Sequence, residues 1–545
     1  MGSKNWQEIA AAKRAAILDS IPKEYIIKNI PTPDQQRDVT GTFVHQYLSA
    51  REIEITETDA VGIVAKTTSG EWTAVEVTKA FIHRASIAHQ LTNCLHETAF
   101  PAAIEAAESL DAHFAAHKKP LGPLHGLPVS LKDQFHVKGL ETSMGYVGWL
   151  GTFEGQHPHP NYPITQESVL VDLLRTLGAV IYVKTAVPHT LMVGETVNNI
   201  VGYTLSPRNR LLSAGGSSGG EGALVALKGS PAGLGTDIGG SIRIPAAFNG
   251  VYGVRPSSGR LPYHGMANSF DGQNSVLSVV GPLAGSVAAL RLLVESVLAA
   301  APWRADPAVV ELPWRAEKAT IPGKLVFGVL RDDGVVGATP PVRRALDEAV
   351  AKLAAAGHAV VEWAPPPHAA VNDCCAQTWL YDGGADSIAA FALSGEPQAE
   401  NVSLPFPDPL PQANASQIAA NNVRKRRLQK EYLDYWNGTA VDAVISPVAP
   451  FPAARPNKYK YYGYSMWVNL LDYTSVVVPV TKVDKGVDVV DKGYQPRSDL
   501  DRETQESYDP EIYDGAPVAV QLVGRRLEEE KMLAVADVVD GILRA

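Results

Sequence analysis

The chain has 545 residues, 45% of them hydrophobic, which is enough to bury a large core. Its formal net charge of −10 argues against a nucleic-acid-binding protein, because such proteins normally carry a basic face. The three cysteines, two of them adjacent at 374 and 375, exclude a disulfide framework and favour a reducing compartment.

The N-terminal segment is charged and amphipathic, unlike the apolar segment of a signal peptide. No apolar run in the sequence approaches the roughly 20 residues that a membrane helix needs. We therefore expect a cytoplasmic protein without a membrane anchor. Residues 1–60 are expected to form a cap of short helices. Residues 61–545 are expected to form one large domain with surface insertions around 365–435, where prolines cluster at 365–367 and 405–411.

Beyond residue 60, apolar strand-like runs alternate with helical patterns. Strands are predicted at 127–131, 179–183, 324–330, 359–361, 440–445, 476–480 and 518–523. Helices are predicted at 167–177, 219–227, 341–356 and 531–543. Such alternation is typical of an α/β fold in which helices cover both faces of a sheet.

Two serines stand in glycine-rich segments. Ser217 lies in Gly-Gly-Ser-Ser-Gly-Gly at 215–220, and Ser241 ends Gly-Thr-Asp-Ile-Gly-Gly-Ser at 235–241. Glycine lets a backbone approach a ligand and aim several N–H groups at one point, as an oxyanion hole requires. A flexible linker is less favoured because the core-grade helix 219–227 follows at once. A phosphate-binding loop is less favoured because its Gly-Lys-Ser/Thr signature is missing from both segments.

A serine nucleophile needs a base, and Lys132 is the candidate because no histidine lies near either segment in the sequence. The ordinary pKa of lysine is about 10.4, so Lys132 would have to be buried to be neutral near pH 7. Its place at the end of the apolar strand 127–131 is consistent with burial. The residues alone favour an ordinary surface lysine at the end of a strand, and the adjacent Asp133 suggests a salt bridge with it.

A different serine hydrolase also fits part of the pattern. Gly-x-Ser-x-Gly at 215–219 matches the nucleophile elbow, with Ser217 as the nucleophile and His264 or His358 as the base. That motif belongs between a strand and a helix, and residues 209–214 make a poor strand. This alternative predicts that Ser241→Ala stays active.

Three segments taken together resemble the amidase signature family. They are Gly-Leu-Pro-Val-Ser-Leu-Lys-Asp at 126–133, the segment 215–220, and the segment 235–245, in the same order along the chain. The stretches 184–188, 192–199 and 461–464 resemble the fungal acetamidase or general amidase branch. The resemblance implies a single α/β/α domain around a mixed, mostly parallel sheet of about eleven strands. It also implies amide hydrolysis that needs neither a cofactor nor a metal.

The resemblance assigns roles to residues. Ser241 resembles the nucleophile and Lys132 the base. Ser217 resembles the serine that relays protons between them, preceded by a cis peptide bond. The backbone amides of Ile238, Gly239, Gly240 and Ser241 resemble the oxyanion hole.

Further residues are expected to support the site. Asp237 and Arg243 are expected to form a buried pair that fixes the nucleophile loop, and Ser218 is expected to set the first loop by local hydrogen bonds. Leu191 and Met192 are candidates for the acyl pocket. An aromatic cluster either covers the entrance or is simply packed in the core; its members are Tyr459, Tyr461, Tyr462, Tyr464 and Trp467.

The substrate stays open at this stage. Small carboxylic amides with short acyl groups are expected, and a broader scope over aryl amides, anilides or carbamates is the alternative. A subunit of an amidotransferase is less favoured because of the acidic net charge and the extra N-terminal and mid-chain residues. A homodimer is compatible with the resemblance.

Overall fold

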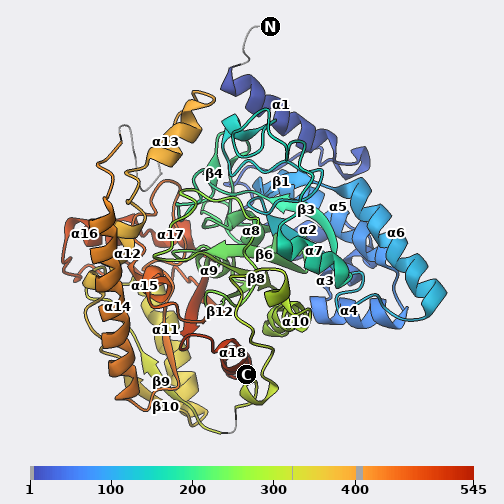
Figure 1. The fold of residues 1–545 in the computed structure, drawn as a ribbon. Helices are drawn as coiled ribbons and strands as arrows, with labels where there is room; N and C mark the ends of the chain where they lie inside the picture. The colour runs from blue at the N-terminus through green and yellow to red at the C-terminus, as the bar shows by residue number, and fades with distance from the viewer. Residues whose placement is uncertain (1–4, 322, 400–408) are drawn as a thin grey trace.

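The computed structural model describes residues 5–321, 323–399 and 409–545, and an eleven-stranded sheet surrounded by helices runs through it (Figure 1). The strand order is β1-β3-β2-β6-β8-β7-β12-β13-β11-β9-β10. The strands are β1 Leu95–Thr98, β2 Pro128–Lys132, β3 Val180–Thr185, β6 Ala232–Asp237, β7 Tyr252–Arg255, β8 Val279–Ala284, β9 Val326–Val329, β10 Ala359–Glu362, β11 Ala443–Pro447, β12 Ser475–Lys482 and β13 Pro517–Val523. A small separate ribbon pairs β4 Val197–Asn198 with β5 Gly202–Tyr203.

The predicted mixed sheet of eleven strands is confirmed, and its parallel pairs fall into two blocks. β2 pairs in parallel with β3 and β6, and β9 pairs in parallel with β10 and β11. The other six pairings are antiparallel, so parallel pairs make up a smaller share than the majority that we expected. One reason is visible between β7 and β8, where the connection 256–278 contains no crossover helix and the strands meet antiparallel.

Helices cover the sheet. They are α1 Trp6–Asp19, α2 Thr42–His45, α3 Ala50–Glu57, α4 Ala60–Ser69, α5 Ala74–Thr92, α6 Phe100–His117, α7 Val169–Thr176, α8 Gly219–Ala226, α9 Arg243–Asn249, α10 Val287–Ala299, α11 Pro340–Ala355, α12 His368–Thr378, α13 Ala385–Ala392, α14 Ala415–Asn437, α15 Gly463–Leu471, α16 Asp499–Ser507, α17 Pro510–Tyr513 and α18 Glu529–Arg544. Of these helices, α1, α2 and α3 lie within the first 60 residues. None of the helices in the described ranges is long and apolar enough to cross a bilayer. The domain boundary near residue 60 remains a prediction.

The predicted insertion around 365–435 contains α12, α13 and α14, and residues 400–408 of it lie outside the described residues.

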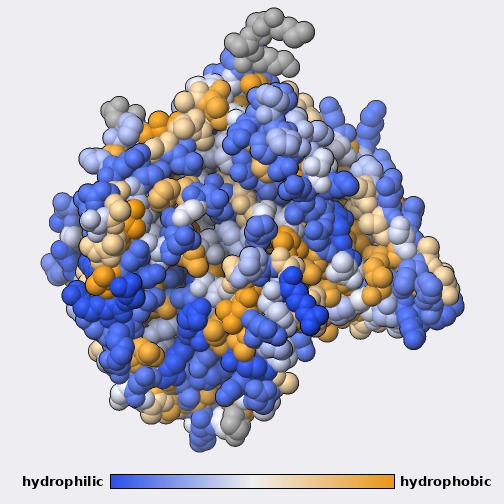
Figure 2. Space-filling model, in the orientation of Figure 1, coloured by the Kyte–Doolittle hydropathy of each residue, from blue (hydrophilic) through white to orange (hydrophobic). Residues whose placement is uncertain are grey.

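Hydrophilic residues cover most of the face seen in Figure 2, with small groups of hydrophobic residues between them.

Strong periodic patterns gave the right elements. Helix α11 buries Val342, Leu346, Ala349 and Leu353, the four residues whose spacing had placed them on one face. Pro340 occupies the first helical turn, where its missing N–H costs nothing.

Strand β6 was missed because its sequence, Ala-Gly-Leu-Gly-Thr-Asp, lacks the alternation of a typical strand. The glycines instead allow neighbouring side chains to approach the strand backbone closely. A Cβ atom on Gly233 would lie 1.8 Å from Glu221 Oε2, and one on Gly235 would lie 2.6 Å from Ser218 Oγ. Both positions therefore need glycine so that α8 and the loop before it can lie against the strand.

The register of two strands brings the candidate residues together. β2 and β6 are parallel, with Ser130 opposite Gly233, so both strands end at the same edge of the sheet. Lys132 ends β2, and β6 ends at Asp237, just before the loop that carries Ser241. Helix α8 starts directly after Ser217 and Ser218, which places that loop at the same edge.

Candidate active site

Lys132 is fully buried and makes hydrogen bonds to hydroxyl groups. Its Nζ donates to Thr236 Oγ1 at 2.6 Å and lies 2.9 Å from Ser217 Oγ. Thr236 Oγ1 in turn donates to Gln134 Oε1 at 2.7 Å. Burial lowers the pKa of Lys132 to about 7, although the nearby carboxyls of Asp237 and Glu221 act in the opposite direction.

The hydrogen bonds suit a neutral amine better than an ammonium group. Among the described residues, Lys132 Nζ has two hydrogen-bond partners, whereas an ammonium group has three N–H donors to satisfy. A neutral amine can donate to Thr236 and keep a lone pair for the hydrogen of Ser217. Lys132 therefore has the surroundings of a base.

Asp133 points away from Lys132, as neighbouring strand residues do. Its carboxylate pairs with Lys184 Nζ at 3.1 Å and accepts from the backbone N–H groups of Ser143 at 3.0 Å and Met144 at 2.8 Å. The alternative of a surface lysine paired with Asp133 is therefore wrong.

The two serine loops lie against each other. The peptide bond between Gly216 and Ser217 is cis, as the family resemblance implied. The N–H of Ser218 donates to the carbonyl oxygen of Ser241 at 3.1 Å, and Ser218 Oγ donates to the Thr236 carbonyl at 3.3 Å. These bonds join the two loops to the end of β6.

Asp237 organises the loop that carries Ser241. Its carboxylate accepts from the backbone N–H groups of Gly240 at 2.9 Å and Ile242 at 3.1 Å, and it forms a fully buried ion pair with Arg243 at 3.0 Å. Burial alone would raise the pKa of the Asp237 carboxyl, but the guanidinium of Arg243 holds it well below its usual range. The Gly240 N–H is thus directed toward Asp237 in this structure.

Helix α15 supports the same loop from more than 220 residues downstream. Arg243 Nη1 donates to the Ser465 carbonyl at 2.9 Å, and Ser465 Oγ donates to the Gly239 carbonyl at 2.5 Å. Asn469 Nδ2 donates to Asp237 Oδ1 at 2.8 Å. Ser465 and Asn469 were not predicted, since nothing in the local sequence of α15 indicates contact with the glycine loop.

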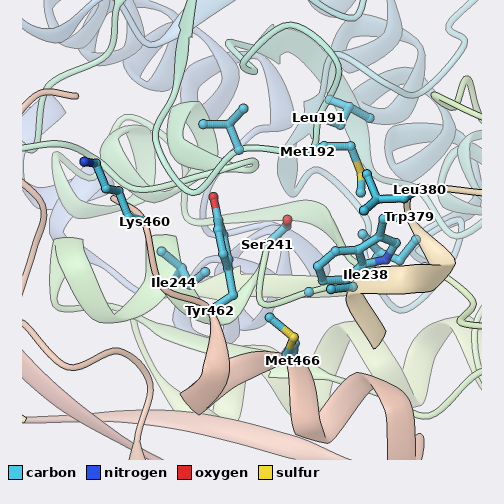
Figure 3. A pocket seen from close by; sticks show the side chains of 13 residues that line it. Leu191, Met192, Ile238, Ser241, Ile244, Trp379, Leu380, Lys460, Tyr462 and Met466 are labelled. Atoms are coloured by element: carbon cyan, nitrogen blue, oxygen red, sulfur yellow. The ribbon is translucent and has the colours of Figure 1, made fainter. Parts of the chain in front are cut away.

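Ser241 opens into a cavity of about 160 Å³ whose walls are mostly apolar (Figure 3). Met192, Trp379 and Leu380 lie to one side of Ser241, and Tyr462 and Lys460 lie to the other. The cavity is lined by Leu191, Met192, Val193, Ile238, Gly239, Ser241, Ile244, Ala376, Trp379, Leu380, Lys460, Tyr462 and Met466. Leu191 and Met192, the candidates from the sequence, are both among them.

Of the predicted aromatic cluster, Tyr462 alone lines the cavity, and its hydroxyl accepts from the Gly194 N–H at 2.7 Å. The other four members, Tyr459, Tyr461, Tyr464 and Trp467, are buried in the surrounding packing. The cluster is therefore mainly part of the core, which was the second of the two interpretations.

Sequence reasoning missed the wall contributed by α12 and the residues just after it. Trp379 packs directly on the loop that carries Ser241, because a Cβ atom on Gly239 would lie 2.8 Å from its ring. Ala376 and Leu380 extend the same wall, and Met466 comes from α15. The need for glycine at 239 was the only trace of this contact in the sequence.

The residues of the nucleophile-elbow alternative lie elsewhere. His264 is exposed on a loop, and His358 Nδ1 accepts from the Leu325 N–H at 3.0 Å, next to β9. No strand immediately precedes Ser217 within the fully described segment 204–218. Among the described residues there is also no group of three His, Cys, Asp or Glu side chains placed to hold a metal ion.

Comparison with known proteins identifies the family. A family model described as Amidase matches residues 76–533. The chain belongs to the amidase signature family. It is 47% identical over 552 residues to an acetamidase of Emericella nidulans, covering 99% of this chain and 98% of that protein. It is also 47% identical over 555 residues to an acetamidase of Aspergillus oryzae, covering 100% of both chains.

Solved structures agree with this assignment. A structure of a fatty acid amide hydrolase matches with a TM-score of 0.92 and 34% identity, covering 99% of this chain and 96% of that one. A bacterial aryl acylamidase matches with a TM-score of 0.68 and 22% identity, which bears on the fold alone. The family, predicted from three motifs, and its fungal acetamidase branch, predicted from three further stretches, are confirmed, and these relatives support an amide hydrolase.

Proposed function

We propose that this amidase hydrolyses small carboxylic amides to a carboxylic acid and ammonia or an amine, through an acyl-enzyme on Ser241. The observation that carries the proposal is the environment of Lys132. It is a fully buried lysine with hydroxyl partners, 2.9 Å from Ser217, with a pKa lowered to about 7. The acetamidase relatives, matched over nearly their whole length, support the same reaction.

In the first stage, the neutral amine of Lys132 takes the proton of Ser217 while Ser217 takes the proton of Ser241. The Ser241 oxygen then forms a bond to the amide carbon, and the carbonyl oxygen becomes an oxyanion. Backbone N–H groups of Ile238, Gly239 and Ser241 are the proposed donors to it, each worth about 3 kcal/mol in such sites. Gly240 is the fourth proposed donor, but it must share its N–H with Asp237.

In the second half of this stage, the ammonium of Lys132 returns a proton through Ser217 to the leaving nitrogen. The C–N bond breaks, and the nitrogen departs as ammonia or an amine instead of an unstable amide anion. Water then attacks the acyl-enzyme, giving up a proton to the same relay, and the acid is released as Ser241 regains its hydrogen. This sequence balances without a cofactor.

The walls of the cavity determine which kind of acyl group fits. They are apolar apart from Ser241, Tyr462 and Lys460, so an uncharged acyl group is expected. The acetamidase relatives favour a short one. The apolar wall that includes Leu191, Leu380 and Met466 suits an aromatic ring and favours a second candidate function, in which aryl amides, anilides or carbamates are also cleaved.

A substrate panel tests both candidates. Purified protein is assayed with acetamide, a long-chain aliphatic amide, benzamide, an anilide and a carbamate, with Ser241→Ala as the control. We expect the highest kcat/KM for short acyl chains, and a strong preference for long chains would contradict this. Hydrolysis by the chain alone would also separate it from an amidotransferase subunit, which requires its partner.

The covalent step has its own test. A fluorophosphonate probe should label Ser241, and peptide mass spectrometry locates the adduct. An adduct on Ser217 or another side chain would overturn the proposed nucleophile.

A further inference from the structure

Glu221 is a fully buried carboxyl group behind the proposed base. It extends from α8 and lies against β6 at Gly233. Its Oε2 lies 2.6 Å from Ser130 Oγ, and its Oε1 accepts from Thr185 Oγ1 at 2.8 Å. Ser130 precedes Lys132 by two residues on β2, and Thr185 is the residue opposite Lys132 on β3. Glu221 is thus held by the two strands that hold Lys132.

The hydrogens of the neighbouring hydroxyls can be counted, since each hydroxyl has one. Ser230 Oγ donates to the Ala232 carbonyl at 2.8 Å, so its hydrogen is used. The 2.9 Å contact between Ser130 Oγ and Ser230 Oγ then takes the hydrogen of Ser130. The 2.6 Å contact between Ser130 and Glu221 is left needing a hydrogen from Glu221 itself.

We propose that Glu221 is a neutral carboxylic acid that donates its hydrogen to Ser130, and that it keeps this hydrogen while Lys132 is a neutral amine. The inference rests on the proposed function for the role of Lys132. Glu221 is then a positioning residue. A neutral Glu221 gives Lys132 no anion with which to form an ion pair. The proton stays on Glu221 and is not transferred to Lys132. The lone pair of the lysine amine therefore stays free to accept the hydrogen of Ser217.

The other groups near Glu221 agree with a neutral cluster. Burial raises the pKa of Glu221 to about 7 even though a positive charge on Lys132 acts in the opposite direction, so the carboxyl holds its proton more strongly when Lys132 is neutral. The titratable groups that face it are Lys132 on β2, Tyr182 on β3 and Cys94 just before β1. Burial raises the pKa of Cys94 to about 12 and that of Tyr182 well above its ordinary value, so both are neutral at pH 7.

The opposite arrangement defines the alternative. If Ser230 turned its hydrogen to Ser130, and Ser130 turned its own to an ionised Glu221, the 2.8 Å contact between Ser230 and the Ala232 carbonyl would lose its hydrogen. The two arrangements differ in one observable, the protonation of Glu221.

Infrared difference spectroscopy measures that protonation without any assay of activity. The spectrum of the wild-type protein minus that of Glu221→Gln, at pH 7, should contain the C=O stretching band of a buried carboxylic acid. Carboxylate bands in its place would overturn the inference. This result stands whether or not Lys132 is the base, so failure of the proposed function is recognised separately.

The pH profile of kcat/KM gives a second measurement. In Glu221→Gln, the new side-chain amide would donate to Ser130 and accept from Thr185 as the acid does, so we expect the acid limb to stay at its wild-type pH. Loss of an ionised Glu221 would instead move the limb to lower pH by about one unit. Ser230→Ala releases the Ser130 hydrogen toward Glu221 and favours its ionisation, so this variant should move the limb to higher pH. An unmoved limb in Ser230→Ala would contradict the proposal, and this test does not depend on the folding of Glu221→Gln.

Thermal unfolding supplies a matched control. A carboxyl whose pKa is raised in the folded protein costs stability as the pH rises from about 4.5 to about 7, so Glu221→Gln should gain melting temperature over wild type across this range. Glu529 is also fully buried, but it pairs with Arg260 at 3.1 Å and accepts from the Ser257 N–H at 2.8 Å. Glu529→Gln should therefore lose melting temperature at pH 7. Equal losses in both variants would contradict a neutral Glu221.

Discussion

Two fully buried lysines on neighbouring strands have opposite surroundings. Lys184, near the end of β3, pairs with the Asp133 carboxylate at 3.1 Å and donates to Thr142 Oγ1 at 2.8 Å. Lys132, at the end of β2, contacts the hydroxyls of Ser217 and Thr236. Burial lowers the pKa of both, but Asp133 opposes this shift at Lys184 through a direct contact.

The comparison separates a structural lysine from a proposed base. A buried carboxylate in direct contact keeps a lysine cationic and makes it part of the scaffold, whereas hydroxyl partners can satisfy a neutral amine. Asp133 is adjacent to Lys132 in sequence but serves Lys184, because the strand alternates sides. The partner across the fold, rather than the neighbour along the chain, decides the role.

Removal of the proposed nucleophile should have the largest effect, and it gives the loss of activity with which the two lysine variants are compared. We expect Ser241→Ala to lower kcat/KM for acetamide by on the order of 10⁴-fold or more, since no other group replaces the attacking oxygen. Steady-state assays check this, with circular dichroism to confirm the fold. A variant that kept substantial activity would return Ser217 to consideration as the nucleophile.

Matched substitutions of Lys132 and Lys184 test whether the two lysines have different roles. Lys132→Met should lower kcat/KM by about 10³-fold, within the range of general-base removal. It should not lower the melting temperature at pH 7, because burial of Lys132 already costs stability there. Lys184→Met leaves Asp133 buried without its cation and should destabilise the fold by about 3–5 kcal/mol. Denaturant unfolding measures the free energy of unfolding of both variants.

Two outcomes would contradict this contrast. Equal loss of stability in both variants would mean that Lys132 is also a structural cation. Full activity in Lys132→Met would remove it from the proton relay.

The pH dependence sharpens the same contrast. Because the pKa of Lys132 is lowered to about 7, kcat/KM should rise with pH through about 7 and fall about tenfold per pH unit below it. The folded protein releases this proton before the unfolded chain does, so this group makes stability increase as the pH rises from about 7 to about 10.5. In Lys132→Met this increase should disappear. An activity profile that is flat between pH 5 and 8 would contradict a titrating base.

The smallest expected effect concerns the pocket wall, away from both lysines. Trp379→Ala should raise the ratio of kcat/KM for benzamide to that for acetamide by about tenfold, because it removes a large apolar side chain from the cavity. Trp6→Ala, in the N-terminal helix α1, is the control and should leave the ratio unchanged. If both variants gave the same ratio, Trp379 would have no part in selecting the acyl group.

The sequence and the structure agree best where signals are local. The segments around Lys132, Ser217 and Ser241 were recognised because their glycines and order are distinctive, and α11 was predicted from its apolar spacing. Strand β6 was missed because close approach had replaced its alternating side chains with glycines.

The pocket wall was beyond sequence reasoning for a different reason. Trp379 follows directly after α12 and Met466 lies in α15, so both are more than 130 residues downstream of Ser241, whose cavity they line. Their side chains are of the same types as ordinary core residues, so the sequence does not distinguish them. Only the folded sheet brings them to the cavity. The partner of Asp133 was hidden in the same way, since Lys184 lies 51 residues further on.

The contact between Trp379 and Gly239 links the selection of the acyl group to the rate of the chemical step. The indole leaves no room even for a methyl group on that glycine, whose N–H is one of the proposed oxyanion donors. An acyl group too wide for the cavity would press the indole into the backbone that must stay still during bond formation. Oversized substrates would then still bind but would react slowly. Discrimination between substrates would therefore appear in kcat more than in KM.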